Sequence, residues 1–145
     1  MPAPTTQNRK FLIFTLQGVR YALDLAQVAE VADPPQLSPI PLAPACYSGA
    51  LNFHGDIVAV IDLALFLSLD GASLPEKVVI LHQKIASLAF SVGTVVRIAS
   101  EEAISFRAAA DTAFASDMLC LPDGEAILLN LEALVLEAEM CIERR

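Results

Sequence analysis

Short apolar segments, each followed by a turn sequence, are the feature that most constrains the fold of this 145-residue chain. Residues 11–16 (FLIFTL) are apolar on both faces, as expected for a strand that is buried on both sides. Gln17-Gly18 is a turn sequence, and residues 20–25 alternate after it, so the two segments are predicted to form a β-hairpin. Short strands recurring about every ten residues favour small barrels over an open α/β sheet.

The rest of the chain continues this pattern and adds three helices. Further hairpins are predicted for 50–54 with 57–61 around Gly55-Asp56, for 78–81 with 85–92 around Gln83-Lys84, and for 118–121 with 126–129 around Pro122-Asp123-Gly124. Single strands are predicted for 95–98 and 104–106, and loops for 70–76 and 108–116. Helices are predicted over residues 25–32, over 63–69 with Asp62 as N-cap, and from about 131 to 142. Residues 34–44 contain five prolines, which predict an extended connector.

One short pattern occurs twice. Residues 57–63 end in Asp62-Leu63, and residues 126–131 end in Asn130-Leu131. Both read as an apolar strand, a capping Asp or Asn, and a leucine that begins a helix. This internal repeat suggests two barrels in one chain.

Charge and hydropathy exclude several classes of function. The formal net charge is −8, and no segment forms the basic stripe that a nucleic-acid-binding protein needs. No apolar run reaches the ~18–20 residues of a membrane span, so we expect no direct membrane insertion. The three cysteines are widely spaced, which fits a reducing cytoplasm better than a disulfide framework. We expect a cytoplasmic protein with a flexible leader, residues 1–9, and a single domain from residue 10 to 145.

The sequence contains no convincing catalytic or metal-binding constellation, and we expect neither an enzyme nor a cofactor. The two histidines, His54 and His82, belong to no metal-ligand motif. A Cys46–His54 nucleophile and base pair is the one enzymatic alternative, although free cysteines are most often buried apolar residues. The aspartates at 24, 56 and 62 are explained by turn and cap positions.

The segment 47–63 (YSGALNFHGDIVAVIDL) resembles the signature of the CheW-like chemotaxis coupling proteins. Its Gly, Asn-x-x-Gly and Asp-Leu positions are Gly49, Asn52, Gly55 and Asp62-Leu63. Residues 14–25 are similar to the family's opening hairpin, residues 28–31 to its first helix, and residues 40–44 to its proline-bearing connector. Residues 78–81 and 127–134 are similar to later strands and the closing helix, so the resemblance extends over about residues 10–138.

The resemblance implies a mainly β fold made of two small, intertwined, SH3-like, five-stranded barrels packed together, with short helices and a C-terminal helix. It implies a non-catalytic adaptor that couples the cytoplasmic tip of a chemoreceptor to the regulatory domain of a CheA-type histidine kinase. A module that binds only one partner, or that serves a pilus, biofilm or second-messenger pathway, is the alternative within this family. The residues implied in partner binding are Val28, Glu30, Asn52, His54, Gly55 and Val78.

Two positions depart from the family pattern. His54 stands where the family has an arginine that pairs with a carboxylate at the position of Glu30. A Glu30–His54 contact would be weaker and dependent on pH, because the imidazole loses its charge near neutrality. Gly93 stands where the family often has an aspartate, and a bulge or bend would explain a glycine there.

Overall fold

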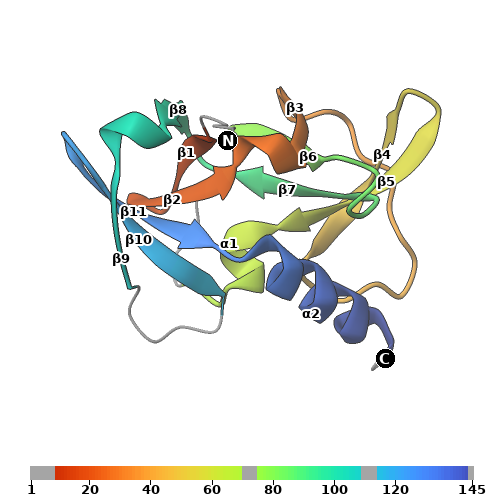
Figure 1. The fold of residues 1–145 in the computed structure, drawn as a ribbon. Helices are drawn as coiled ribbons and strands as arrows, with labels where there is room; N and C mark the ends of the chain where they lie inside the picture. Colours follow the sequence, from red (N-terminus) through yellow and green to blue (C-terminus); the bar gives the residue numbers. More distant parts are fainter. Residues whose placement is uncertain (1–8, 70–74, 109–113, 144–145) are drawn as a thin grey trace.

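The computed structural model describes residues 9–69, 75–108 and 114–143, and it contains two β-sheets followed by a C-terminal helix (Figure 1). The leader 1–8 and most of the loops predicted at 70–76 and 108–116 lie outside the described residues. Arg9, assigned to the leader, contacts Asp24 at 3.2 Å and places its guanidinium over the Phe11 ring. None of the helices in the described part is long and apolar enough to cross a membrane.

The first sheet has the strand order β8-β1-β2-β11-β10-β9, and the second has the order β3-β6-β7-β5-β4. The strands of the first sheet are β1 (Lys10–Leu16), β2 (Val19–Asp24), β8 (Val95–Ser100), β9 (Ser105–Ala108), β10 (Ala115–Leu121) and β11 (Gly124–Leu129). Those of the second are β3 (Val28–Ala32), β4 (Tyr47–Phe53), β5 (Asp56–Asp62), β6 (Lys77–Leu81) and β7 (Leu88–Val92). The second sheet is therefore inserted in the chain between β2 and β8. The first sheet has six strands rather than five, because β9 continues it beyond β10.

Alternate side chains of the central strands enter different cores, which explains why these strands are apolar on both faces. On β1, Phe11 and Ile13 belong to the core of the first barrel. Leu12 and Phe14 point the other way, into a larger core that the two sheets share with the C-terminal helix. On β6, residues 78 and 80 likewise enter the second barrel, and residues 79 and 81 enter the shared core.

The internal repeat found in the sequence is confirmed in the fold. In both sheets two antiparallel hairpins are joined by one parallel pair, β1-β2-β11-β10 in the first and β6-β7-β5-β4 in the second. Helix α1 (Leu63–Phe66) follows β5, and its N-cap Asp62 accepts a 3.2 Å hydrogen bond from the amide of Leu65. Helix α2 (Leu131–Glu143) follows β11, and Asn130 accepts a 3.1 Å hydrogen bond from the amide of Ala133.

The helix predicted over residues 25–32 is wrong. Only a 3-10 turn, η1 (Leu25–Gln27), precedes strand β3, and Asp24 caps it by accepting a 3.0 Å hydrogen bond from the amide of Ala26. The apolar spacing was compatible with a helix, but a single turn or two has too few hydrogen bonds to form alone. Pairing with β6 gives the backbone of β3 its partners instead, with Val31 opposite Val79.

Two predicted boundaries also move, and the connector gains one bridge. Helix α1 ends at Phe66 rather than at residue 69, since Ser68 has a left-handed φ of 61°. Strand β7 begins at Leu88, and residues 82–87 form a longer connection than the Gln83-Lys84 turn. The connector 34–44 contains no strand or helix, as predicted, but Ser38 forms an isolated bridge with Ala50 of β4.

Candidate protein–protein interface

Asn52, His54 and Gly55 lie together at the β4–β5 hairpin. Residues 54 and 55 have positive φ values, 52° and 91°, so the two-residue turn is His54-Gly55 rather than the predicted Gly55-Asp56. Positive φ at both central positions is typical of a type I′ hairpin turn. The amide of Gly55 donates a 3.0 Å hydrogen bond to Oδ1 of Asn52. Asn52 therefore holds the turn, and His54 is exposed with its ring 4.3 Å from that of Phe53.

Val28, Glu30 and Val78 lie on the paired strands β3 and β6 at the other edge of the second sheet. The side chain of Val78 is 2% exposed and belongs to the core of the second barrel. Val28 is 9% exposed and belongs to the shared core. A partner at this edge would therefore meet the exposed Glu30 and the backbone of β3, while the two valines are buried on opposite faces of the sheet.

The contact between Glu30 and His54 expected from the sequence is not made. No ion pair joins these two residues within the described part of the chain. Strand β3 and the β4–β5 hairpin lie at opposite ends of the strand order of the second sheet (Figure 1). The six implied binding residues thus form two separate groups.

The Cys46–His54 pair of the enzymatic alternative is also not formed. Cys46 directly precedes β4, where its carbonyl accepts a 2.8 Å hydrogen bond from the amide of Asp62, and His54 directly follows β4. A seven-residue strand separates them, and at 3.3–3.4 Å per residue this places the two on the order of 20 Å apart.

Two isoleucines, one on each sheet, have strongly exposed side chains. Ile98 is 52% exposed on β8, which is the terminal strand of the first sheet. Ile57 is 68% exposed on β5, next to the hairpin turn. Terminal strands also present backbone groups that another chain can pair with. The sequence analysis named neither isoleucine, and their exposure depends on which face each barrel encloses.

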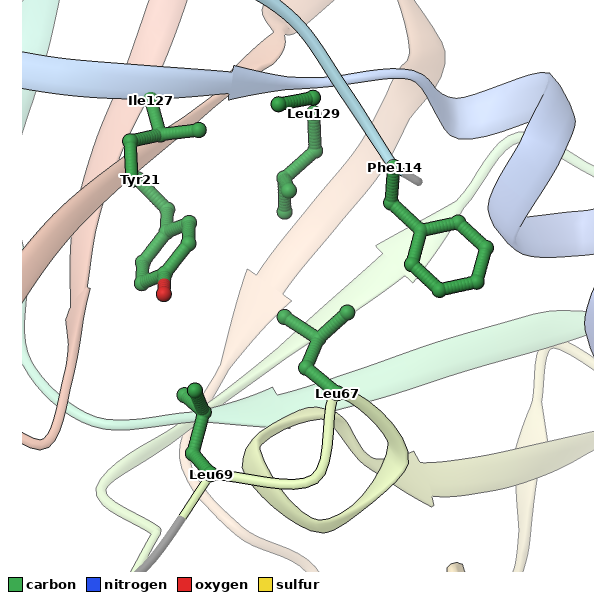
Figure 2. Close-up of a pocket in the computed structure, with 7 residues that line it drawn as sticks. Tyr21, Leu67, Leu69, Phe114, Ile127 and Leu129 are labelled. Carbon is green, nitrogen blue, oxygen red and sulfur yellow. The ribbon is translucent and has the colours of Figure 1, made fainter. Parts of the chain in front are cut away.

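An apolar pocket of about 260 Å³ lies where the first sheet meets the end of α1. Figure 2 shows Tyr21 and Leu129 of the first sheet facing Leu67 and Leu69, which follow α1, with Phe114 beside them. Burial in this pocket raises the pKa of the Tyr21 hydroxyl above its ordinary value. The sequence did not reveal this pocket, because the helix was predicted over residues 63–69, whereas Leu67 and Leu69 follow the end of α1.

The ion pairs at the surface of both sheets join side chains of neighbouring strands and turns. Asp123, in the β10–β11 turn, lies 3.2 Å from Arg20 and 2.7 Å from Arg97, and hydrogen bonds from these two guanidinium groups hold the pKa of its carboxyl below the usual value. Lys77 lies 2.6 Å from Asp33 and lowers the pKa of that carboxyl in the same way. Within the described ranges, no three His, Cys, Asp or Glu side chains group together as metal ligands.

The two fused β-barrels have exposed strand edges and exposed apolar side chains. The polar side chains described above cap helices and turns instead of gathering in one cluster. These features define a protein-binding module. The family model of the CheW-like domain matches residues 10–139, and the chain belongs to this family. The chain is 28% identical over 148 residues to the chemotaxis protein CheW of Klebsiella aerogenes, with 97% of this chain and 89% of that protein covered. The crystal structure of the scaffolding protein TtCheW from Thermoanaerobacter tengcongensis matches with a TM-score of 0.75 and 26% identity, over 88% of this chain and 92% of that one.

Proposed function

We propose that this protein is a non-catalytic adaptor that couples the cytoplasmic tip of a chemoreceptor to the regulatory domain of a CheA-type histidine kinase. The observation that carries the proposal is the CheW-like match over residues 10–139, which includes both barrels. An adaptor has to hold two partners at once. The two groups of candidate binding residues, at opposite edges of the second sheet, meet that requirement.

The receptor is proposed to bind at the terminal strands β3 and β8. Val28 of β3 and Val78 of β6 are buried on opposite faces of this strand pair, and Glu30 is the exposed charge on β3. Ile98 supplies exposed apolar area on β8. An amphipathic receptor helix would bury its apolar face here and leave its polar face in water.

The kinase regulatory domain is proposed to bind at the β4–β5 hairpin. The Asn52–Gly55 hydrogen bond fixes the turn, so His54 and Ile57 are presented in one geometry. A rigid apolar projection loses little conformational entropy when it is bound, which favours association.

Two matched substitutions test this assignment. Ile98→Asp and Ile57→Asp each place a carboxylate on an exposed strand position, one in each proposed surface. Titration calorimetry would measure each variant against a receptor-tip fragment and against the kinase regulatory domain. We expect Ile98→Asp to weaken only receptor binding, and Ile57→Asp only kinase binding, each by roughly tenfold or more.

Binding of wild type to both partners, with both variants unaffected, would retain the adaptor function and refute the assignment of surfaces. Binding to a single partner would contradict the coupling role. Binding to neither would overturn the proposal as a whole. Unchanged melting temperatures for both variants would serve as the control for folding.

A further inference from the structure

A surface groove runs along one side of α2, between this helix, η1 and the β6–β7 connection. It has a volume of about 480 Å³ and is lined by α2, by Gln27 of η1 and by Ile85 of the β6–β7 connection. The residues of α2 that line it are Glu132, Val135, Leu136 and Glu139. Figure 1 shows α2 lying along one side of the molecule.

Of the apolar residues that line this groove, Val135 belongs to the shared core and Ile85 packs against it, whereas Leu136 is not part of that core. The inner face of α2, which includes Leu134 and Ala138, is fully buried in the shared core. Leu136 is instead 59% exposed, and Met140, one turn further on, is 40% exposed. Side chains four residues apart are neighbours on a helix, so these two form one apolar ridge beside the groove.

Carboxylates lie at both ends of the groove. Glu132 and Glu139 are exposed, and α2 contains no Lys or Arg. Within the described part of the chain neither glutamate makes an ion pair, and His82 and Lys84, in the same connection as Ile85, do not reach them. The two glutamates are seven residues apart, which is about 10.5 Å along a helix.

We propose that this groove binds a helix of a partner protein that carries an apolar ridge between two basic residues spaced two turns apart. Such a helix would place an apolar side chain between Leu136 and Ile85, and a Lys or Arg next to each of Glu132 and Glu139. A second copy of this chain fits poorly, since it would bring two more carboxylates on a protein with a net charge of −8. Gln27 of the groove directly precedes Val28 of β3, but Glu132 and Glu139 belong to neither of the surfaces proposed for the receptor and the kinase, so the substitution of these two glutamates tests the groove alone.

The probe is a synthetic peptide of about 18 residues, or five helical turns, with leucines on one face and lysines seven residues apart flanking them. One control peptide has the same residues in scrambled order, and another has a central proline that breaks the helix. Fluorescence anisotropy would give Kd for the full-length chain, and amide chemical shifts would locate the bound peptide. We expect binding of the probe alone, with shifts at α2 and at residues 82–87.

The matched protein variants are Glu132→Lys with Glu139→Lys, and Asp56→Lys with Glu102→Lys. Both double substitutions change the net charge equally, but only the first lies at the groove. We expect the first to weaken probe binding by roughly tenfold or more, and the second by less than about threefold. Equal loss in both variants, equal binding of the scrambled or proline peptide, or shifts centred away from α2 would each overturn the proposal.

Discussion

Gly93, between β7 and β8, packs directly against Thr15 of β1, where the chain passes from the second barrel back to the first. Its amide donates a 2.9 Å hydrogen bond to the carbonyl of Thr15, and a Cβ at position 93 would lie 2.7 Å from the same oxygen. Gly93 lies in a bend, which is one of the two explanations predicted from the sequence, and the close approach to Thr15 requires a glycine there. An aspartate at this position would meet the backbone of β1.

We predict that Gly93→Ala lowers the free energy of unfolding by about 1–3 kcal/mol, because β1 or the 93–94 turn has to move. The measurement is urea unfolding followed by circular dichroism. Thr94→Ala is the control, since Thr94 is exposed and its hydrogen bonds with Thr15 come from its backbone: its amide donates to Oγ1 at 3.1 Å, and its carbonyl accepts from the amide at 2.8 Å. Equal stability of Gly93→Ala and wild type would show that the contact relaxes freely.

Val78→Asp is predicted to destabilise the whole fold. A carboxylate at this 2% exposed position would enter the apolar core of the second barrel, where residues such as Leu51 and Ile80 surround it. The expected loss is at least about 3 kcal/mol. Thermal unfolding of this variant would be compared with that of Ile98→Asp, which is expected to lose less than about 1 kcal/mol. A folded Val78→Asp protein with a normal melting temperature would mean that this side chain reaches the surface.

His54 is predicted to act through turn geometry and not through Glu30. A φ of 52° suits asparagine and opposes a β-branched residue. We expect His54→Asn to match or exceed wild-type stability, and His54→Val to lose about 1–2 kcal/mol. Urea unfolding of the three proteins at a single pH gives the comparison. If Glu30→Gln lost as much stability as His54→Val, the result would support a contact between Glu30 and His54 and contradict this prediction.

The Asp123 carboxyl is predicted to make the free energy of unfolding depend on pH in the acidic range. Its folded pKa lies below the unfolded value of 3.8, so its ion pairs stabilise the fold above that pH. The contribution is lost as the pH falls through the depressed folded pKa, because the protonated carboxyl no longer attracts Arg20 and Arg97. Asp123→Asn should therefore be less stable than wild type at pH 6, and the difference should shrink below the ordinary pKa. A difference that stays constant from pH 6 to strong acid would argue against this linkage.

Local chemistry was readable in the sequence. The Gln17-Gly18 turn, with φ values of 52° and 85°, and the capping roles of Asp62 and Asn130 all depend on a few adjacent residues. The strands other than β3, the closing helix and the repeat follow from such signals. The family pattern then extended these local signals to two barrels.

The tertiary structure decided which side chains are exposed and which segments meet. Residues 28–32 form a strand because their backbone pairs with that of β6. Val78 is a core residue because the second barrel encloses its side chain. Glu30 and His54 were separated because β3 and β4 ended at opposite edges of one sheet. Periodicity identifies an apolar face but not what covers it, since burial depends on contacts between residues that are distant in the chain. The exposure of Ile98 and Leu136, and with it every surface proposed for binding, was therefore fixed only when the two barrels and α2 packed together.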